Sequence, residues 1–476
     1  MINSSDDLFP CVRKENCSIL LDETKHISVS PRIHYIDYSV VVPPNASKVG
    51  LVLSFHKEKL AQLFVSLHDP DGFRGNRMKP GGKGDIALEL WVSPDEASEG
   101  GVPGAIPAGE WRAQIDIERL GEDVDCRLVM YAEFDPVQPA VQLDYPQVVV
   151  RPEPGWYKGE LHCHSTESDG KYPVATVVQA AVDAGLDFLS LTDHFTNSQW
   201  WKLAKLKQQR QIALIRSLEI TSHQGHANLH GLNEWVDVYV DRPDWSMNQA
   251  ADAVHDQQGL FCINHPFSSD LAWRSFDFQW ERADLMEIYH NLEGANNHFH
   301  PGLWDLLLNQ GHRIIGVGGT DSHDPFTGTD RLNQVVTWVY ADELSEAGII
   351  AGLRSGRVYI SRGPELRFTA RNAKGQTVQM GESIKTEGEP VSLDLQIKSE
   401  EPLRLFVFRD GLLFDTDLVE PGSGEWTKWT VVDHHPAETG YYRVELHQVY
   451  KNPKHPGIEW RDYTTTRLIS NPVWVK

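Results

Sequence analysis

Between residues 155 and 364 the sequence alternates strand-like and helix-like segments, and this alternation restricts the fold more than any other feature of the chain. The segment PVATVVQAAVDAG places Val174, Val177, Val178 and Ala181 on one helical face, and the apolar run LDFLSLTDH follows it. The pairs MNQAADAVHDQQG with LFCINHP, and PGLWDLLLNQG with HRIIGVGGTDSH, repeat the same order. Alternating strands and helices predict an α/β fold with a largely parallel sheet, and a barrel is compatible with this length.

The two flanking regions have the pattern of all-β domains. Short runs such as VGLVLSF and CRLVMYAEF in the first region, and VSLDLQIK and LRLFVFRDG in the last, are separated by Gly, Pro and Asp clusters. The Pro-rich stretch PVQPAVQLDYPQVVVRPEPGW is typical of a linker. We therefore expect an N-terminal β-sandwich over residues 1–150, a central α/β domain over 151–364 and an Ig-like β-sandwich over 365–476.

Composition limits the partners and the compartment. The formal net charge of -23 argues against binding to nucleic-acid polymers or anionic membranes, and no apolar run is long enough to span a bilayer. The start MINSSDDLFP does not resemble a signal peptide. The five cysteines form no CxxC pair, which indicates a reducing compartment, and we predict a cytoplasmic location. The oligomeric state is left open.

Every strand-like run in the middle region ends in side chains that can bind a metal. His162 and His164 are two residues apart, so both lie on one face of a strand. Active sites of parallel α/β folds form at the carboxyl ends of the strands, so side chains that follow different strands are expected to converge. The candidates are His162, His164, Asp169, Asp193, His194, Glu219, His226, His265, Asp321 and His323. Mixed imidazole and carboxylate ligands suit Zn, Mn and Fe(II).

Single histidines are common in protein cores and on surfaces, so the remaining ones of this region are interpreted as structural. His230 stays a rival to His226 as a ligand. Cys163 lies between the two histidines and should point to the opposite strand face, where a small buried residue is the ordinary role. For Asp193, support of a neighbouring ligand and a purely structural hydrogen bond are equally good explanations.

The motifs HCHSTESDG, LTDH, EI…GH, NHP and GTDSH occur in the order of the PHP (polymerase and histidinol phosphatase) superfamily, which the chain resembles over residues 156–364. The segments GRVYISRGP and NPVWVK look like the CehA/McbA-type subgroup, which includes carbaryl hydrolases. The resemblance implies a distorted (β/α)7 barrel between flanking β-domains, with two or three divalent ions, usually Mn, Zn or Fe.

Carried onto this sequence, the resemblance implies three metal positions. The first would be held by His162, His164, Glu219 and Asp321. Glu219 would bridge to the second, which His226 and His265 complete, and the third would be held by Asp169, His194 and His323. Some relatives carry histidine where Asp169 stands, and an aspartate there weakens the third position or favours a harder ion.

These features predict a hydrolase that uses a metal-activated water, with Asp193, His194 and Glu219 as catalytic residues. Its expected substrate is a small molecule, a phosphomonoester or phosphodiester. The alternative is a carbamate, ester or amide hydrolase with the same site. Neither a GxSxG nor a GxxxxGK[ST] motif occurs, which argues against serine-hydrolase and nucleotide-driven chemistry.

The rim of the pocket should distinguish the two reactions, because a phosphate favours Lys or Arg and an aryl carbamate favours aromatic rings. NSQWWKL and LAWRSF each contain Trp and a basic residue, and packing of the barrel helices is their more ordinary role. A third hypothesis is a binding protein whose β-sandwiches hold a carbohydrate or a partner.

Overall fold

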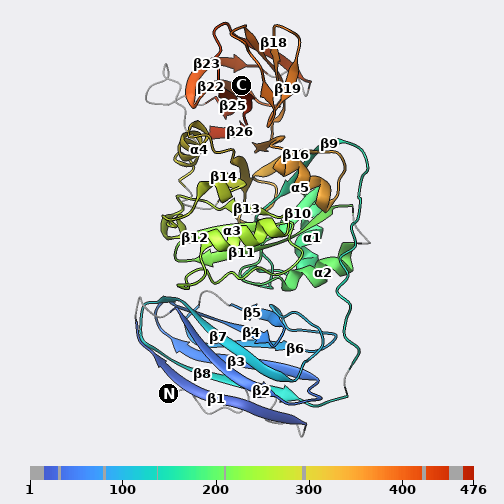
Figure 1. Ribbon diagram of the computed structural model, residues 1–476, viewed down its shortest axis with the longest axis vertical. Coiled ribbons are helices and arrows are strands. Elements are labelled where there is room, and N and C mark those ends of the chain that lie inside the picture. Colours follow the sequence, from blue (N-terminus) through green and yellow to red (C-terminus); the bar gives the residue numbers. More distant parts are fainter. Residues whose placement is uncertain are drawn as a thin grey trace.

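The computed structural model describes residues 16–29, 34–78, 82–136, 138–207, 211–291, 296–420, 425–449 and 465–476. The N-terminal strands lie at the bottom of Figure 1, the helix-bearing sheet in the middle and the C-terminal strands at the top. The segment that precedes the central sheet, residues 138–154, runs along the outside of the molecule (Figure 1). The opening segment MINSSDDLFP and Cys11 lie outside the described residues.

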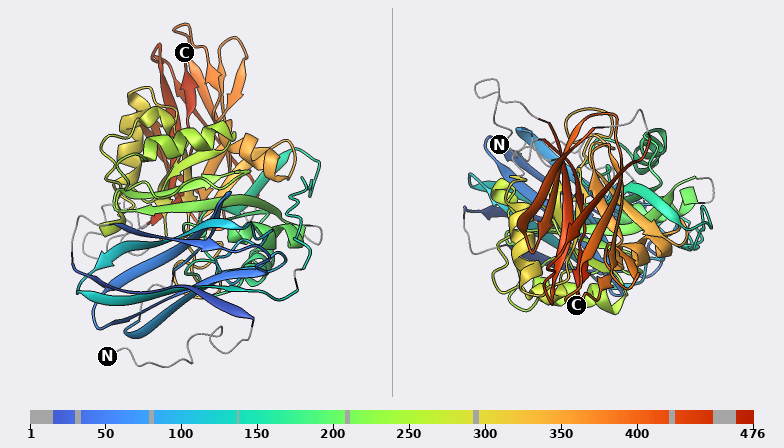
Figure 2. Two further views of the ribbon diagram at one scale, coloured as in Figure 1. Left: turned by 60° about the horizontal axis from the view of Figure 1, so that its bottom comes forward. Right: turned by 90° about the horizontal axis from the view of Figure 1, so that it is seen from above.

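Two antiparallel four-stranded sheets form the N-terminal region (Figure 2). One has the order β1 (Cys17–Ile27), β8 (Val124–Glu133), β3 (Lys48–Lys57) and β6 (Gly84–Val92). The other has the order β2 (Tyr35–Val42), β7 (Gly109–Leu120), β4 (Ala61–Asp69) and β5 (Gly72–Arg77). Alternating apolar side chains from both sheets, including Leu51, Leu53, Val65 and Ile115, share one core. This region is therefore all-β, as its short strand-like runs predicted.

The central sheet contains, in spatial order, β15 (Ile315–Gly319), β14 (Leu285–His290), β13 (Leu260–Ile263), β12 (Gly225–His230), β11 (Ala213–Ser222), β10 (Phe188–Leu191), β9 (Gly155–Glu160) and β16 (Val336–Ala341). The helices are α1 (Val174–Asp183), α2 (Ser198–Lys207), α3 (Met247–Asp256), α4 (His300–Asn309) and α5 (Glu346–Arg354), with 3-10 turns at Ser269–Leu271 and Trp280–Arg282. The expected alternation of strands and helices is present.

A regular succession of seven strand–helix units is not what the described residues show. β12 is antiparallel to both β11 and β13, because β11 and β12 form a hairpin with no helix between them. Gly225, with φ of 118°, allows the chain to reverse there. At the ends of this stretch, Thr337 Oγ1 on β16 accepts from Gly318 N on β15 at 3.0 Å and donates to Gly318 O at 2.9 Å. Strands β15 and β16, the first and the last in the spatial order given above, therefore lie side by side.

Helix α1 illustrates how local sequence sets an element. It begins after Pro173 and is followed by Gly185, whose φ of 70° is the left-handed value that favours glycine beyond a helix end. The residues expected to form its apolar face are buried: Val174, Val177, Val178 and Ala181.

The central sheet continues into the C-terminal region. β16 pairs with β17 (Val358–Ser361), and β17 pairs with β26 (Thr466–Ser470) through the register Tyr359↔Ser470. The path then follows β25 (Gly440–Gln448), β22 (Leu403–Arg409) and β23 (Leu412–Val419), with β27 (Val473–Val475) and β20 (Ser383–Ile384) beside it. A second sheet has the order β19 (Thr377–Gln379), β18 (Glu365–Asn372), β21 (Val391–Lys398) and β24 (Thr427–Asp433). The predicted boundary at residue 364 thus lies beside a continuous sheet, and the domain limits stay a prediction.

One apolar cluster joins all three regions. Phe64 of β4 packs on Phe195, with ring centroids 5.7 Å apart, and the same cluster contains Trp304 of α4 and Tyr441 of β25. The sheets that flank the central one are therefore packed against it and contribute to its core.

The cysteines differ from the expectation. Cys17 is disulfide-bonded, whereas the cysteines were expected to be reduced. Cys126, Cys163 and Cys262 are free and buried, so Cys163 is a small buried residue as expected. Disulfides are rare in the cytosol, which weighs against the cytoplasmic location; that location stays a prediction.

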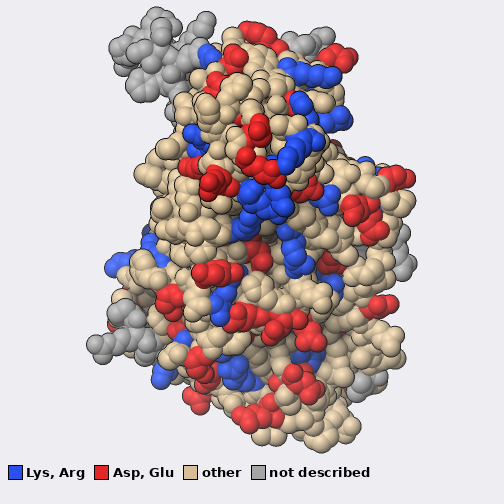
Figure 3. Space-filling model, turned by 45° about the horizontal axis from the view of Figure 1, so that its top comes forward, with Lys and Arg blue, Asp and Glu red and all other residues tan. Residues whose placement is uncertain are grey.

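Charged side chains of both signs are interspersed over the face in Figure 3, with a group of basic ones near its middle. Among the described residues, no helix combines the length and the apolar character needed to cross a membrane.

Candidate metal centre

The structure brings all nine predicted metal ligands to one centre, where they form three overlapping groups. Their backbones meet because the strand ends pair with one another. His194 forms a parallel bridge with Glu219, and Cys163, between the two histidines of HCH, forms one with Ser322. The groups are His162, His164, Glu219 and Asp321; Glu219, His226 and His265; and His164, Asp169, His194 and His323.

The first group is buried. His162 Nε2 lies 3.3 Å from Glu219 Oε2 and 3.3 Å from Asp321 Oδ1. His164 Nε2 lies 2.8 Å from Asp321 Oδ1 and 3.5 Å from Glu219 Oε2. Two ring nitrogens and two carboxylate oxygens therefore face one point, an arrangement suited to a borderline divalent ion.

The second group shares the carboxylate of Glu219 with the first. Its other oxygen, Oε1, lies 3.1 Å from His226 Nδ1 and 4.0 Å from His265 Nε2. Asn264 Nδ2 donates to this oxygen at 2.9 Å, which fixes the orientation of the carboxylate. Each oxygen of Glu219 thus points toward a different group.

The third group lies on the side of the centre that opens to solvent. Asp169 Oδ2 lies 3.1 Å from His323 Nε2, and Asp169 Oδ1 lies 3.6 Å from His194 Nε2. The side chain of His323 is 30% exposed, whereas His162, His164 and Glu219 are completely buried. Of these side chains, His323 is therefore the most accessible to solvent.

Of the two rival ligands His226 and His230, only His226 lies in this centre. The ring of His230 faces away, with Nδ1 2.9 Å from Ser190 Oγ and 3.1 Å from Ser217 Oγ. Burial lowers the pKa of His230 to about 3, so this ring stays neutral.

The carboxylates of the centre require compensating positive charge. Burial alone would lower the pKa of His194, but Glu219 and Asp169 raise it to about 9. Asp169 likewise outweighs burial at His323 and raises its pKa to about 10. Burial, together with the charges on His323 and His194, lowers the pKa of His164 to about 4.

Several ligand atoms in the centre lack a hydrogen-bond partner within the described part of the chain. They are His162 Nε2, His164 Nδ1, Glu219 Oε2, His226 Nε2 and both ring nitrogens of His265. An unsatisfied buried polar atom costs about 1–3 kcal/mol, so a cluster of them is maintained only when something else satisfies it. Divalent cations fit, because every one of these atoms is a metal-ligating type.

The backbone is strained at two of the ligand residues. His265 has φ of 25° and Asp321 has φ of 54°, values that residues other than glycine rarely adopt. Such strain is found mainly at functional sites, where surrounding contacts hold it.

Asp193 does not belong to any of the groups. Its Oδ1 accepts from Ser165 N and Ser168 Oγ, and its Oδ2 accepts from Ser165 Oγ, each at 2.8 Å. These bonds order the turn that carries Asp169. A catalytic role for Asp193 stays a prediction.

The N-terminal sheets hold the same turn from the other side. Arg77 Nη1 donates to Thr166 O at 2.9 Å, and Glu167 Oε2 accepts from Gly100 N at 3.1 Å. Gly100 O also accepts from Thr196 Oγ1 at 3.0 Å, just after His194. The flanking domain therefore supports the two loops that form the open side of the centre.

The two Trp-containing segments serve packing. Trp200 and Trp201 are buried, and Trp200 Nε1 donates to Ser217 O at 2.8 Å. Trp273 packs on Phe278, with ring centroids 5.2 Å apart. Neither segment settles the chemistry of the rim.

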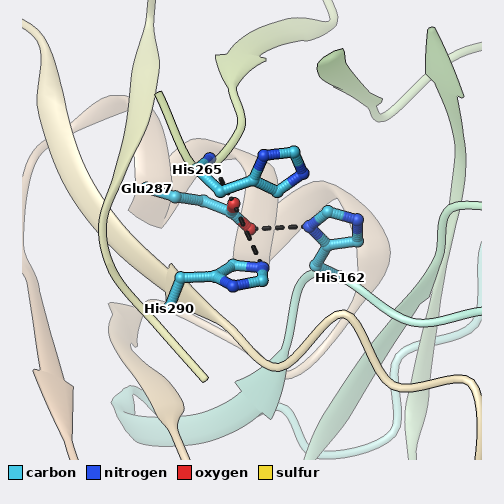
Figure 4. A group of neighbouring side chains, drawn as sticks. All are labelled: His162, His265, Glu287 and His290. Carbon is cyan, nitrogen blue, oxygen red and sulfur yellow. Dashed lines mark hydrogen bonds and ion pairs between the residues drawn. The ribbon is translucent and has the colours of Figure 1, made fainter. Parts of the chain in front are cut away.

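Three buried side chains beside the centre were not expected from the sequence. Glu287 and His290 of β14 form a further metal-capable group with His162 and His265 (Figure 4). Glu160 accepts from the backbone nitrogens of His162 and Thr320, both at 3.1 Å, and ties β9 to the end of β15. An acidic residue inside an apolar strand run, as in LMEIYH, is the signal that could have revealed Glu287.

Comparisons with known proteins return short or distant matches, and no family model matches the chain. The DNA polymerase/3'-5' exonuclease PolX of Bacillus subtilis is 40% identical over 63 residues, which is 12% of this chain and 10% of that protein. A two-domain protein of Bacteroides vulgatus that contains a predicted PHP-like metal-dependent phosphoesterase is 19% identical. It covers 68% of this chain and 99% of its own, with a TM-score of 0.39. An amidohydrolase of Chromobacterium violaceum is 15% identical, covers 35% and 88% of the two chains, and has a TM-score of 0.29.

The residues that the PHP-like motifs supply converge in space, as their order predicted. The chain thus resembles the PHP superfamily in the order of these motifs and in the place where their side chains meet. The CehA/McbA subgroup stays a prediction. The PHP-like motifs HCHSTESDG, LTDH and GTDSH follow β9, β10 and β15, and EI…GH spans the hairpin of β11 and β12.

Proposed function

We propose that this protein is a metal-dependent hydrolase and that its substrate is a phosphomonoester or phosphodiester. One observation carries the proposal: three groups of metal-ligating side chains overlap at Glu219 and His164, and several of their buried ligand atoms lack hydrogen-bond partners in the described residues. A binding protein would have no need of such a centre.

Each proposed ion has its own set of ligands. His162, His164, Glu219 and Asp321 would hold the first ion; Glu219, His226 and His265 the second; and Asp169, His194 and His323 the third. The expected ions are Mn, Zn or Fe. When bound, such ions lower the pKa of a water and offset negative charge on the reacting oxygens.

The chain's own side chains divide the remaining tasks. Glu219 places one oxygen toward each of two groups, which sets their separation. His194 is at the open side, with Nε2 3.6 Å from Asp169 Oδ1 and Nδ1 3.0 Å from Glu219 Oε2, where an entering substrate would meet it. We assign Asp193 a positioning role through the turn of Ser165 and Ser168.

Charge favours a phosphate ester as the substrate. The proposed ligands include three carboxylates, from Asp169, Glu219 and Asp321. Three divalent ions would bring six positive charges against these three carboxylates and the neighbouring carboxylate of Glu287, so the loaded centre keeps a net positive charge inside a chain whose net charge is -23. A local cationic site of this kind attracts a dianionic or monoanionic phosphate more strongly than a neutral carbamate.

The alternative, a carbamate, ester or amide hydrolase, has one observation in its favour. Phe326, 48% exposed, packs edge-on against Tyr172 at 5.1 Å between ring centroids, three residues beyond His323. An aromatic pair beside the open side would suit an aryl substrate, in keeping with the resemblance to the CehA/McbA-type subgroup.

We further infer that the eight strands from β15 to β16 correspond to the distorted (β/α)7 barrel, with the hairpin of β11 and β12 counted as one of its seven units, and that flanking domains lie at residues 1–150 and 365–476. The adjacency of β15 and β16 supports this inference.

The test compares initial rates for bis(p-nitrophenyl) phosphate, p-nitrophenyl phosphate and an aryl N-methylcarbamate on Mn-loaded and Zn-loaded protein. His162→Ala serves as the blank, and His230→Ala is the matched control because its ring is equally buried but faces away from the centre. Turnover of a phosphate ester that is lost in His162→Ala and kept in His230→Ala supports the proposal. Turnover of the carbamate alone overturns the choice of substrate, and no turnover of any of them overturns the phosphoesterase assignment.

A further inference from the structure

Glu287 of β14 contacts His162 of the first group and His265 of the second, although it is a member of neither of these two groups. Its side chain is 2% exposed and lies between the rings of His162, His265 and His290 (Figure 4). We propose that Glu287 is a positioning residue that fixes the ring of His162 and the backbone of His265, so that one carboxylate sets ligands of both the first and the second ion. This inference rests on the proposed metal-dependent function.

The contact with His162 determines which ring nitrogen is available to an ion. His162 Nδ1 lies 2.8 Å from Glu287 Oε1. A carboxylate only accepts hydrogen bonds, so Nδ1 carries the proton and donates. The neutral ring then keeps its lone pair on Nε2, the atom 3.3 Å from both Glu219 Oε2 and Asp321 Oδ1. A carboxylate behind a histidine ligand commonly orients the ring and raises its basicity in this way.

The contact with His265 acts on the backbone. His265 N donates to Glu287 Oε2 at 2.8 Å. This residue has φ of 25°, so its backbone needs a contact that holds the strained conformation. The bond keeps the His265 ring turned toward the centre, where Nε2 lies 4.0 Å from Glu219 Oε1.

The packing around Glu287 leaves its carboxylate little freedom. A Cβ atom added to Gly319 of β15 would lie 2.4 Å from Glu287 Oε1 and 2.8 Å from the Cβ of His162. The glycine therefore lets β15 close over the pair, and the carboxylate cannot swing away from the ring.

A fourth ion bound by Glu287 is the competing explanation, because His162, His265, Glu287 and His290 also form a metal-capable group. Both oxygens of Glu287 already accept from N–H donors at 2.8 Å. An ion would have to displace these donors and would take His162 away from Glu219 and Asp321. The hydrogen-bond pattern thus favours positioning over a fourth ion.

The test is the substitution Glu287→Gln, read out by ion affinity and by the visible absorption spectrum of Co(II)-loaded protein. A glutamine offers one acceptor oxygen and one donor amide, so it cannot accept from both His162 and His265. We expect Zn(II) affinity, measured by chelator competition, to fall about 10–100-fold, and the Co(II) spectrum to change because the ligand geometry changes.

Glu445→Gln is the matched control. Glu445 is completely buried and also touches a histidine ring, with Oε2 2.8 Å from His447 Nε2, but it lies in β25, away from the centre. Its substitution should leave ion affinity and the Co(II) spectrum unchanged even where the urea midpoint falls. A role of Glu287 in stability alone would give the same result for both variants.

The outcomes separate the inference from the proposed function. Unchanged affinity and spectrum in Glu287→Gln, while His162→Ala loses ions, overturn the positioning role and leave the metal centre intact. An intact chain that binds no divalent ion overturns both. If Glu287→Gln does not fold, Glu287→Asp keeps the charge but withdraws the carboxylate by one methylene, and the same loss of affinity is expected; wild-type affinity in that variant contradicts the inference.

Discussion

Replacing Arg443 by methionine should destabilise the protein by about 3–5 kcal/mol, the cost of breaking a buried ion pair. Arg443 of β25 is completely buried, and its Nε and Nη2 donate to Asp305 Oδ1 and Oδ2 at 2.8 and 2.6 Å. Asp305 belongs to α4, whose Trp304 shares a core with Ile288 of β14, the strand that carries Glu287. The pair therefore anchors the C-terminal sheet to the helix behind the metal centre.

The magnitude follows from what remains after the substitution. Asp305 keeps a hydrogen bond from Tyr441 Oη, and Glu445 keeps its contact with His447, but both buried carboxylates lose their cation. The chain offers a control with the same geometry in solvent: Arg127 Nε and Nη2 donate to Asp22 at 2.8 and 2.7 Å, with side chains 32% and 46% exposed. Arg127→Met should cost no more than about 1 kcal/mol, because solvent screens the pair.

Urea unfolding followed by circular dichroism and by tryptophan fluorescence measures both values. A shift of the midpoint at constant m-value reports the change in stability. Equal losses for Arg443→Met and Arg127→Met, or a loss below about 1 kcal/mol for Arg443→Met, would refute the reasoning that burial makes this pair important.

Three further predictions follow from other contacts. Asp193→Asn should weaken ion binding at Asp169 about 10-fold, because the turn beside it loses an acceptor; metal stoichiometry at limiting ion reports this. Gly319→Ala should abolish turnover while the circular dichroism spectrum is retained, because the added Cβ would meet Glu287 Oε1 at 2.4 Å. Burial would raise the pKa of Asp433, but its hydrogen-bond donors outweigh burial and lower the pKa in the folded protein. Asp433 therefore stabilises the folded state above the unfolded pKa of about 3.9, and this contribution is lost as the pH falls through the lower folded pKa. Asp433→Asn should remove that part of the acid dependence in urea midpoints measured across this range.

Each of these three predictions has a result that would contradict it. Full occupancy in Asp193→Asn would show that the turn does not depend on the carboxylate. Gly302→Ala is the control for Gly319→Ala, because nothing lies within 4 Å of a Cβ at that position; equal effects of the two would contradict the steric argument. An unchanged acid transition in Asp433→Asn would show that this carboxylate is not linked to unfolding.

Most of the ligand set could be predicted because most ligands follow an apolar strand run, and carboxyl ends of neighbouring strands meet. His265 after β13 and Asp321 after β15 are examples. Glu219 and His226 are exceptions, since they lie within β11 and β12. Glu287 could not be placed in the same way, because it lies within β14, where the period of 2 does not say which neighbour a side chain touches. The orientation of Asp193 depends on a rotamer that the sequence does not specify.

The topology was harder to predict from the sequence than the site. The hairpin of β11 and β12 was not predicted from the sequence, because only the turn at Gly225 separates two buried segments. The pairing of Tyr359 with Ser470 joins strands more than a hundred residues apart, and such a contact depends on packing and not on local propensity. The continuity of the central and C-terminal sheets therefore emerged only from the structure.

Anomalous diffraction from Mn-loaded crystals, collected on both sides of the manganese edge, tests the central claim most directly. The account predicts two peaks on opposite oxygens of Glu219, with a third between Asp169, His194 and His323. No peak beside Glu219 at saturating Mn(II), or peaks confined to other parts of the molecule, would contradict it.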